Sequence, residues 1–297
     1  MRTRFAPSPT GPLHLGHAYA AILAHDMARQ SGGEFLLRIE DIDQSRARPE
    51  WEEAILDDLH WLGLSWETPV LRQSDNLSAY ASALDTLWAG DLLYPCSCTR
   101  RDIEAALIAP QEDASVTGPD GPVYPGTCRG RHCGGLPCSL MPRPEDRHLR
   151  LDIGAALGYL DHRVDAPDHG SCGLAFLETG PAHAGDVFTS GNDFETRIGD
   201  VVLARRDMET SYHLSVVIDD AAQGITHVTR GDDLFAATAI HVLLQRLLGL
   251  STPIYHHHRL IRDAAGKRLA KRDDARSIGK YRDEGASPAD IRAMVGL

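Results

Sequence analysis

Residues 4–17 read Arg-Phe-Ala-Pro-Ser-Pro-Thr-Gly-Pro-Leu-His-Leu-Gly-His, which predicts a short strand, a turn and the start of a helix that runs to about Gln30. A helix N-terminus carries unpaired N–H groups and the positive end of the helix dipole, so it favours anions. His14 and His17 are three residues apart and share one helical face, with Gly16 between them. The pattern indicates a phosphate or nucleotide site, although a capped helix with two surface histidines would read the same way.

A second strand follows this helix within the first 40 residues. Gly32 and Gly33 end the helix, and residues 34–40 form an apolar run typical of a buried strand. A strand–helix–strand unit of this length predicts a parallel sheet, in which ligands gather at the carboxyl ends of the strands. Ser8, Glu40 and Asp41 lie at those ends.

The second half of the chain repeats this alternation. The pattern predicts a strand at 200–205, a helix at 212–222, a strand at 225–230 and a helix at 234–248. We therefore predict an α/β fold with a doubly wound, Rossmann-type parallel sheet that is interrupted by an insertion. Pro49 predicts a further helix to about Leu62, and another is expected from about Ser78 to Ala89.

The interruption is a segment rich in Pro, Gly and Cys, with one short helical stretch at 101–107. It has too few apolar residues for a core of its own, and small units of that kind are usually held by metal. The expected organisation has a first catalytic half, a Cys-rich insertion, a second half and a short helical tail, at residues 1–94, 95–148, 149–275 and 276–297.

Composition narrows the class of protein. With 42% hydrophobic and 24% charged residues, the chain is typical of folded proteins and not of disordered ones. The net charge of −12 argues against broad nonspecific binding of nucleic acid. The N-terminus lacks the apolar region of a signal peptide, and no apolar run is long enough for a membrane span. We expect a cytoplasmic enzyme whose six cysteines serve as thiols or metal ligands and not as disulfides.

A basic loop at residues 266–272 is the second candidate site. It follows a segment at 254–262 that is expected to be extended, and it would supply a mobile ammonium group to match the amides and imidazoles of the opening turn. Phosphoryl and nucleotidyl transfer require such positive groups where charge builds up on phosphate oxygens. Taken alone, the loop is more typical of a solvated basic turn than of a binding site. Walker A, GxGxxG and GxSxG sequences are absent.

Several segments in order resemble class I aminoacyl-tRNA synthetases of the glutamyl type. Residues 7–17 resemble the HIGH motif and residues 268–272 a divergent KMSKS loop, with further similarity at 38–43, 212–220 and 229–234. The resemblance covers about residues 2–275. A standard glutamyl-tRNA synthetase has an anticodon-binding domain after the KMSKS loop, where this sequence stops. In ending there and in carrying a Cys-rich insertion, the sequence resembles the glutamyl-Q tRNA(Asp) synthetase family. That family attaches glutamate to the queuosine base of tRNA(Asp).

The resemblance implies roles for particular residues. Guanidinium groups would bind the two carboxylates of L-glutamate, Glu40 its ammonium group, and backbone and side chains after the first strand would line the same pocket. This glutamate set is Arg4, Phe5, Ala6, Pro7, Ser8, Glu40, Tyr212 and Arg230. ATP, with Mg²⁺, would be held by His14, Gly16, His17 and Lys271, and the two histidines and the lysine would stabilise the transition state of adenylate formation. In the loop, Arg268 and Ala270 replace the usual Lys and Ser, while Lys271 is retained.

The cysteines resemble the zinc site of the same family. Its pattern CxC…YxxxC corresponds to Cys96, Cys98, Tyr124 and Cys128, a closed set of three thiolates and one phenolate that would hold one structural Zn²⁺. Three residues just downstream could compete as ligands, namely His132, Cys133 and Cys138. Consecutive residues 256–258 are all His, but neighbours on a strand alternate faces, so they are expected to flank the adenine pocket and not to bind one ion.

Two other functions remain compatible with the sequence. The chain could be a short glutamyl-tRNA synthetase that charges a tRNA 3′ end, or an inactive paralogue that acts as a tRNA-binding or regulatory module. The missing domain argues against the first, and the retained His14, His17 and Lys271 argue against the second. A monomer is the default expectation, and candidate tRNA contacts are Arg100, Arg101, Arg129 and Arg131.

Overall fold

The computed structural model describes residues 1–108, 117–130, 133, 136–162, 173–262 and 276–297. Its first sheet contains β1 (Arg2–Phe5), β2 (Glu34–Ile39) and β3 (Glu67–Arg72), in the order β1-β2-β3 and all parallel. Helix α1 (Leu15–Gln30) connects β1 to β2, and α2 (Pro49–Trp61) lies between β2 and β3. The predicted strand–helix–strand unit is confirmed, whereas β3 was not predicted.

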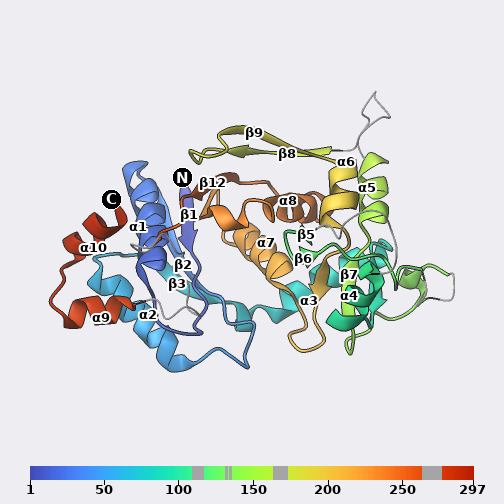
Figure 1. Ribbon diagram of the computed structural model, residues 1–297, viewed down its shortest axis with the longest axis horizontal. Helices are drawn as coiled ribbons and strands as arrows, with labels where there is room; N and C mark the ends of the chain where they lie inside the picture. Colours follow the sequence, from blue (N-terminus) through green and yellow to red (C-terminus); the bar gives the residue numbers. More distant parts are fainter. Residues whose placement is uncertain (109–116, 131–132, 134–135, 163–172, 263–275) are drawn as a thin grey trace.

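The second sheet has the order β11-β12-β8-β9, with β11 (His227–Gly231), β12 (Ile254–His258) and β8 (Gly173–Glu178) parallel. Strand β9 (Gly185–Ser190) pairs with β8 in the antiparallel direction. The two sheets meet along β1, because the amide of Thr226 donates to the carbonyl of Arg2 at 3.0 Å, and the Arg2 amide donates to Thr226 Oγ1 at 2.8 Å. Both halves of the chain thereby place the carboxyl ends of their strands near one another (Figure 1).

A third, antiparallel sheet has the order β10-β7-β4, from β10 (Val202–Ala204), β7 (His148–Leu151) and β4 (Leu93–Cys96). The expectation that residues 200–205 join the parallel sheet is therefore wrong. A short apolar run indicates a strand but does not reveal its partner. Because Cys96 pairs with His148, the Cys-rich segment leaves and re-enters the fold through adjacent strands.

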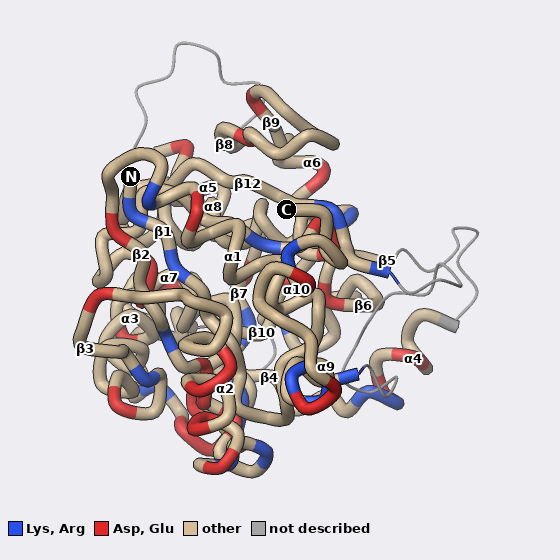
Figure 2. The backbone as a smooth tube through the Cα atoms, turned by 90° about the vertical axis from the view of Figure 1, so that its left-hand side faces the viewer, with Lys and Arg blue, Asp and Glu red and all other residues tan. Residues whose placement is uncertain are grey.

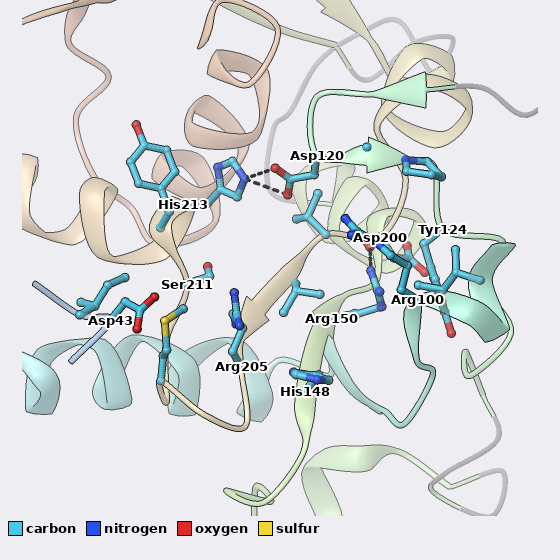
Figure 3. Close-up of a pocket in the computed structure, with 18 of the residues that line it drawn as sticks. Asp43, Arg100, Asp120, Tyr124, His148, Arg150, Asp200, Arg205, Ser211 and His213 are labelled. Atoms are coloured by element: carbon cyan, nitrogen blue, oxygen red, sulfur yellow. Dashed lines mark hydrogen bonds and ion pairs between the residues drawn. The ribbon is translucent and has the colours of Figure 1, made fainter. Parts of the chain in front are cut away.

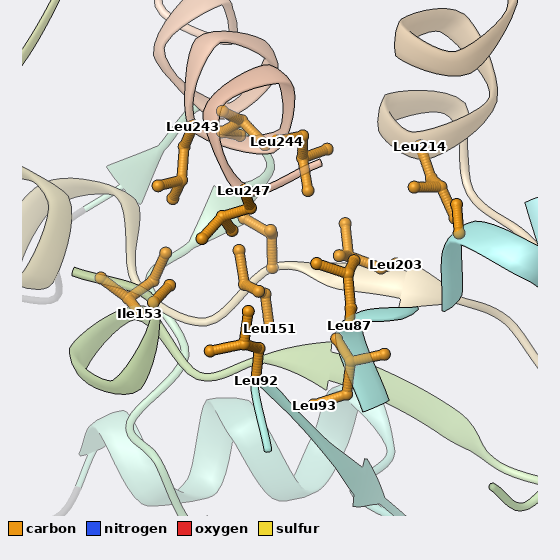
Figure 4. Close-up of a cluster of buried hydrophobic side chains, with 14 of the residues drawn as sticks. Leu87, Leu92, Leu93, Leu151, Ile153, Leu203, Leu214, Leu243, Leu244 and Leu247 are labelled. Carbon is orange, nitrogen blue, oxygen red and sulfur yellow. The ribbon is translucent and has the colours of Figure 1, made fainter. Parts of the chain in front are cut away.

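Helices cover these sheets. The apolar faces of α3 (Leu77–Ala89), α5 (Ile153–Asp161), α7 (Tyr212–Ala222) and α8 (Thr238–Leu247) enclose one large core with the antiparallel sheet (Figure 4). A second core lies around β1 and β2. The Cys-rich segment contributes α4 (Arg100–Ile108) and the hairpin strands β5 (Thr117–Gly118) and β6 (Gly121–Pro122). The remaining short elements are η1 (Gln73–Asp75), η2 (Cys138–Leu140), α6 (Gly191–Asp193), η3 (Phe194–Ile198) and η4 (Asp232–Leu234).

The chain ends in two helices, α9 (Ile278–Asp283) and α10 (Pro288–Val295), that pack beside α1 and α2 (Figure 1). Ile278 and Ile291 are fully buried in the second core. Arg292 of α10 forms an ion pair with Asp26 of α1, and Arg282 of α9 pairs with Asp57 of α2. Figure 2 shows acidic residues concentrated along α2. Among the described residues, no helix is long and apolar enough to cross a membrane.

Asp58 on α2 should make stability depend on pH in a direction unusual for a carboxylate. It is 7% exposed, and burial, followed by repulsion from Asp57, raises its pKa to about 6. The native state therefore holds a disfavoured charge above pH 6, and this cost disappears as the pH falls towards 4. Asp58→Asn is expected to raise the free energy of unfolding, measured by urea denaturation, by about 1–2 kcal/mol at pH 7.5.

The same substitution should have almost no effect at pH 4. The exposed Glu53 on the same helix is the matched control, and Glu53→Gln should not stabilise the protein at either pH. An equal gain for Asp58→Asn at both pH values would contradict the prediction.

Candidate functional site

The opening turn places two imidazole rings at the start of α1. His14 is the N-cap residue, and its Nδ1 accepts a hydrogen bond from the Gly16 amide at 3.1 Å. In return, the His14 amide donates to Nδ1 of His17 at 3.2 Å. The rings stack with their centroids 3.8 Å apart. The predicted pairing of His14 and His17 at the helix start is confirmed, and each ring satisfies a backbone group that the helix leaves unpaired.

Gly16 makes room for the His14 ring. A Cβ atom at residue 16 would lie 2.9 Å from Cε1 and 3.1 Å from Nδ1 of His14. Gly16→Ala is therefore expected to displace the ring, remove the N-cap bond at a cost of about 1 kcal/mol, and raise the KM for ATP in an ATP–pyrophosphate exchange assay several-fold.

Gly158 in α5 provides the matched control for Gly16, because a Cβ atom there would meet open space. Gly158→Ala should leave the KM for ATP unchanged. A wild-type KM for ATP in the Gly16→Ala variant would show that the position of the His14 ring is immaterial.

The chain returns to this turn after the basic loop. Ser277 forms a β-bridge with His14, and the Ile278 amide donates to the Leu13 carbonyl at 2.8 Å. Lys271, together with Arg268 and Ala270, lies outside the described residues. Ser277 follows Lys271 by only six residues. Its contact with His14 is therefore consistent with a site to which both the opening turn and the basic loop contribute.

A buried charge cluster occupies the carboxyl ends of β1 and β2. Arg4 binds Asp220 of α7 through Nε at 2.9 Å and Nη2 at 3.3 Å. The fully buried Arg38 binds Asp220 at 2.6 Å and Glu40 at 3.1 Å, and its Nε lies 3.7 Å from Asp219. Two guanidinium groups thus face three carboxylates. Burial raises the pKa of Glu40 and of Asp219, whereas Arg4 and Arg38 outweigh burial and lower the pKa of Asp220.

Three of the predicted glutamate residues, Arg4, Glu40 and Arg230, lie near enough to Tyr212 for their charges to act on its hydroxyl. Burial raises the pKa of the Tyr212 hydroxyl, the charges of Arg230 and Arg4 oppose this, and the charge of Glu40 adds to it. The Glu40 amide donates to the Pro7 carbonyl at 3.0 Å, which fixes the end of β2 against the segment that follows Phe5. Ala6 and Ser8 flank Pro7 in that segment.

A cavity of about 780 Å³ opens beside this cluster (Figure 3). Of the predicted residues, Ser8, Glu40 and Tyr212 line it, while Arg4 and Arg230 lie buried behind its wall. The opposite wall comes from the Cys-rich segment and from β7, and it includes Arg100, Asp120, Tyr124, His148 and Arg150. The cavity is several times larger than a free amino acid, so it has space for a second reactant.

The predicted zinc ligands converge at the edge of this cavity. The sulfurs of Cys96, Cys98 and Cys128 lie within 4.8 Å of one another. The Tyr124 hydroxyl is 3.5 Å from Sγ of Cys96 and 3.3 Å from Sγ of Cys98. Three sulfurs and one phenol oxygen at such separations match the donor set of a closed tetrahedral site.

Arg150 supports this cluster from outside. Its Nε donates to Sγ of Cys96 at 3.3 Å, and its guanidinium lies 3.8 Å above the ring of Tyr124. A positive charge in this place would favour the thiolate and phenolate forms that a metal requires.

Cys133 and Cys138 are joined by a disulfide, which corrects the expectation that the cysteines are free thiols or metal ligands. Neither sulfur can then compete for a metal at the cluster. The spacing of these cysteines gave no sign of the bond, because disulfide pairing requires a specific distance in space. His132 and Cys172 lie outside the described residues.

The arginines predicted to contact tRNA have different surroundings in the structure. Arg100 lines the cavity and Arg101 is exposed on α4. Arg129 binds the buried Asp200 through Nε at 3.0 Å and Nη2 at 2.7 Å, so its charge is used within the fold. Arg131 lies outside the described residues.

The three consecutive histidines have different partners, as the alternation of a strand predicts. His256 contacts Thr179, and the ring of His258 packs against Tyr19 of α1. His257 is buried between Arg230 and Glu178. The expectation that the three histidines flank an adenine pocket stays a prediction.

The comparisons with known proteins show the family of this chain. The family model for the catalytic domain of class I tRNA synthetases (E and Q) matches residues 1–118 and 183–297. A relative from Rhodobacter capsulatus, named glutamyl-Q tRNA(Asp) synthetase, is 61% identical over 298 aligned positions that cover 100% of both chains. The chain belongs to the glutamyl-Q tRNA(Asp) synthetase family. A member from Geobacter sulfurreducens is 40% identical over 94% of this chain and 78% of its own.

Solved structures place the family among class I synthetases. A glutamate tRNA ligase from Elizabethkingia meningosepticum, in complex with its amino acid, matches with a TM-score of 0.73 and 27% identity. The match covers 100% of this chain and 60% of that ligase. A methionyl-tRNA synthetase from Mycobacterium tuberculosis has the same fold with a TM-score of 0.61 at 12% identity.

Sequence reasoning gave no role to Arg38, Asp219 or Asp220, although they form the centre of the charge cluster. A usable signal was present, since Arg38 interrupts an apolar strand and the aspartates follow an apolar run on α7. Charged residues at buried positions require partners of opposite charge. Their presence in two buried elements could have predicted that β2 and α7 are in contact.

Proposed function

We propose that this protein activates L-glutamate with ATP to form glutamyl-adenylate and transfers the glutamyl group to the queuosine base of tRNA(Asp). The observation that carries the proposal is the 61% identity, over the full length of both chains, to a protein named for this activity. The geometry of the cavity supports each half of the reaction.

The charge cluster suits an α-amino acid that has an additional carboxylate. Glu40 lines the cavity with its side chain 11% exposed, and the cluster contains one carboxylate more than its two guanidinium groups. The ammonium group of glutamate would balance that charge. Arg230, whose charge acts on Tyr212 and which binds no carboxylate directly in the described structure, would receive a substrate carboxylate.

The opening turn would hold ATP. The start of α1 offers its dipole and two imidazoles, and the chain returns there after the basic loop. We infer that Lys271, Mg²⁺ and the two histidines stabilise the charge on the α-phosphate as a glutamate carboxylate oxygen attacks it and pyrophosphate leaves. A covalent intermediate with the protein is not required.

We infer that Cys96, Cys98, Tyr124 and Cys128 hold one structural Zn²⁺ that organises residues 95–148 as an inserted subdomain. The donor set supports this role, because three thiolates and a phenolate leave no open coordination position. The zinc would hold this wall of the cavity against the catalytic half and would take no part in the chemistry.

The acceptor is tested by transfer of labelled glutamate. The proposal requires that queuosine-containing tRNA(Asp) is labelled, that unmodified tRNA(Asp) and tRNA(Glu) are not, and that labelling survives removal of the tRNA 3′ end. Labelling that depends on the 3′ end would favour a short glutamyl-tRNA synthetase. Absence of glutamate-dependent ATP–pyrophosphate exchange under all conditions would favour an inactive paralogue.

A further inference from the structure

Arg230 is the centre of a buried hydrogen-bonded chain that ends in a carboxylate on each side. On one side, Nη1 of Arg230 lies 2.9 Å from Nδ1 of His241, and Nε2 of His241 lies 3.0 Å from Nδ1 of His213. Nε2 of His213 is 2.9 Å from both carboxylate oxygens of Asp120 (Figure 3). On the other side, Nε of Arg230 donates to Nε2 of His257 at 3.0 Å, and His257 Nδ1 contacts Glu178.

The position of each proton in this chain follows from the donors available. Arginine has only donors, so the facing nitrogens of His241 and His257 must accept. His241 then carries its hydrogen on Nε2 and donates to His213, which in turn donates through Nε2 to Asp120. His257 likewise donates through Nδ1 to Glu178. Burial lowers the pKa of His241 strongly and that of His257 to about 4, so both rings are neutral at pH 7.

This arrangement leaves the charge of Arg230 available. Its third contact is with Thr238 Oγ1 at 2.6 Å, so three of its five N–H groups have neutral partners, and the other two have no partner among the described residues. Arg4 differs, because the carboxylate of Asp220 already binds its guanidinium from two atoms. A guanidinium that is fixed in orientation but not paired with a carboxylate is suited to a carboxylate of the substrate.

The two carboxylates that end this hydrogen-bonded chain, Asp120 and Glu178, lie between residues 119 and 182, which the family model of class I tRNA synthetases (E and Q) does not match. The arginine and the three histidines between them lie in the residues that the model matches. Asp120 occupies the tight turn between β5 and β6. Gly118 lets this hairpin pack closely, since a Cβ atom there would lie 2.5 Å from the carbonyl of Arg197. The Asp120 side chain is 51% exposed and lines the cavity, whereas His213 behind it is buried.

We propose that Asp120 is a positioning residue for glutamate binding, which acts through His213 and His241 to hold Arg230 with two N–H groups directed at a substrate carboxylate. The inference rests on the proposed activation of glutamate. Without Asp120, the hydrogen on Nε2 of His213 loses its acceptor, and the ring is free to carry its hydrogen on Nδ1. That tautomer meets another N–H at His241, so the contact with Arg230 is weakened.

The test is the KM for glutamate and for ATP in ATP–pyrophosphate exchange by the full chain without tRNA. Asp120→Ala is expected to raise the KM for glutamate about tenfold or more and to leave the KM for ATP within about twofold of wild type. Asp120→Asn keeps an oxygen that accepts from His213, and it should restore the KM for glutamate to within about threefold of wild type.

Control variants distinguish a positioning role of Asp120 from a purely structural one. They also distinguish failure of this inference from failure of the proposed function. Asp146→Ala removes an exposed carboxylate of the same Cys-rich segment and should change neither KM. If Asp120→Ala does not fold, Asp120→Gly, which also removes the acceptor and suits a tight turn, replaces it under the same criteria. A KM for glutamate within twofold of wild type, or an equal rise in both KM values, would overturn the inference. Absence of exchange in the wild type would instead refute the proposed function.

Discussion

Arg230→Gln is expected to lower kcat/KM for glutamate in ATP–pyrophosphate exchange by about 100-fold or more. Glutamine cannot supply the charged fork that the proposed contact with a substrate carboxylate requires, and loss of such a contact in a buried site costs about 3 kcal/mol. The amide of glutamine can still donate to His241 or His257, so the surrounding hydrogen bonds are only partly lost. The KM for ATP should change little.

Arg230→Lys should be impaired almost as strongly, because an ammonium group keeps the charge but not the planar geometry. Arg246→Gln is the matched control, since Arg246 is exposed on α8, the helix that carries His241. Thermal unfolding of each variant identifies a loss of fold. A folded Arg230→Gln protein with wild-type kcat/KM for glutamate would exclude Arg230 from the glutamate site.

Cys96→Ser is expected to abolish zinc binding and to lower the midpoint of thermal unfolding by about 5 °C or more. Elemental analysis of the wild type should find one zinc per chain. Structural zinc sites contribute directly to folding free energy, and a loss of about 3 kcal/mol corresponds to such a shift in a chain of this size. Cys96 is 1% exposed, so the Cys96→Ser variant would also bury a polar hydroxyl in place of the sulfur that is proposed to bind the metal.

Variants of the neighbouring residues test which groups bind the metal. The double variant Cys133→Ser/Cys138→Ser removes the disulfide and should retain one zinc per chain. Tyr124→Phe deletes the proposed fourth ligand and should weaken zinc binding in a competition assay with a chelator. Full zinc content in Cys96→Ser, or loss of zinc in the double cysteine variant, would contradict this ligand set.

Local features of the chain were predictable because local chemistry produces them. Helix α7 begins at Tyr212 and ends at Ala222, as predicted, because Ser211 caps its first turn and apolar residues follow with helical spacing. The strand–turn–helix of residues 4–17 was predictable for the same reason. In contrast, residues 202–204 form the expected strand but in a different sheet, because pairing depends on which strands lie nearby.

In the candidate site, too, some features could be predicted from the sequence and others could not. Glu40, Tyr212 and the two histidines of the opening turn could be named from ordered motifs, and the structure places Glu40 and Tyr212 at one cavity. The disulfide between Cys133 and Cys138 could not be named, although both cysteines were visible, because five residues of separation allow many geometries.

By itself, the sequence determined the α/β class and the strand–turn–helix at its start, since both depend on residue type and spacing along a short stretch. The residues proposed to bind glutamate came from the resemblance of ordered motifs to a known family. Only the tertiary structure decided what surrounds Arg230. Asp120 and His213 are 93 residues apart in the chain, and Glu178 and His257 are 79 apart. A hydrogen bond requires its two atoms to be about 3 Å apart, and only the folded backbone brings such distant residues to that separation.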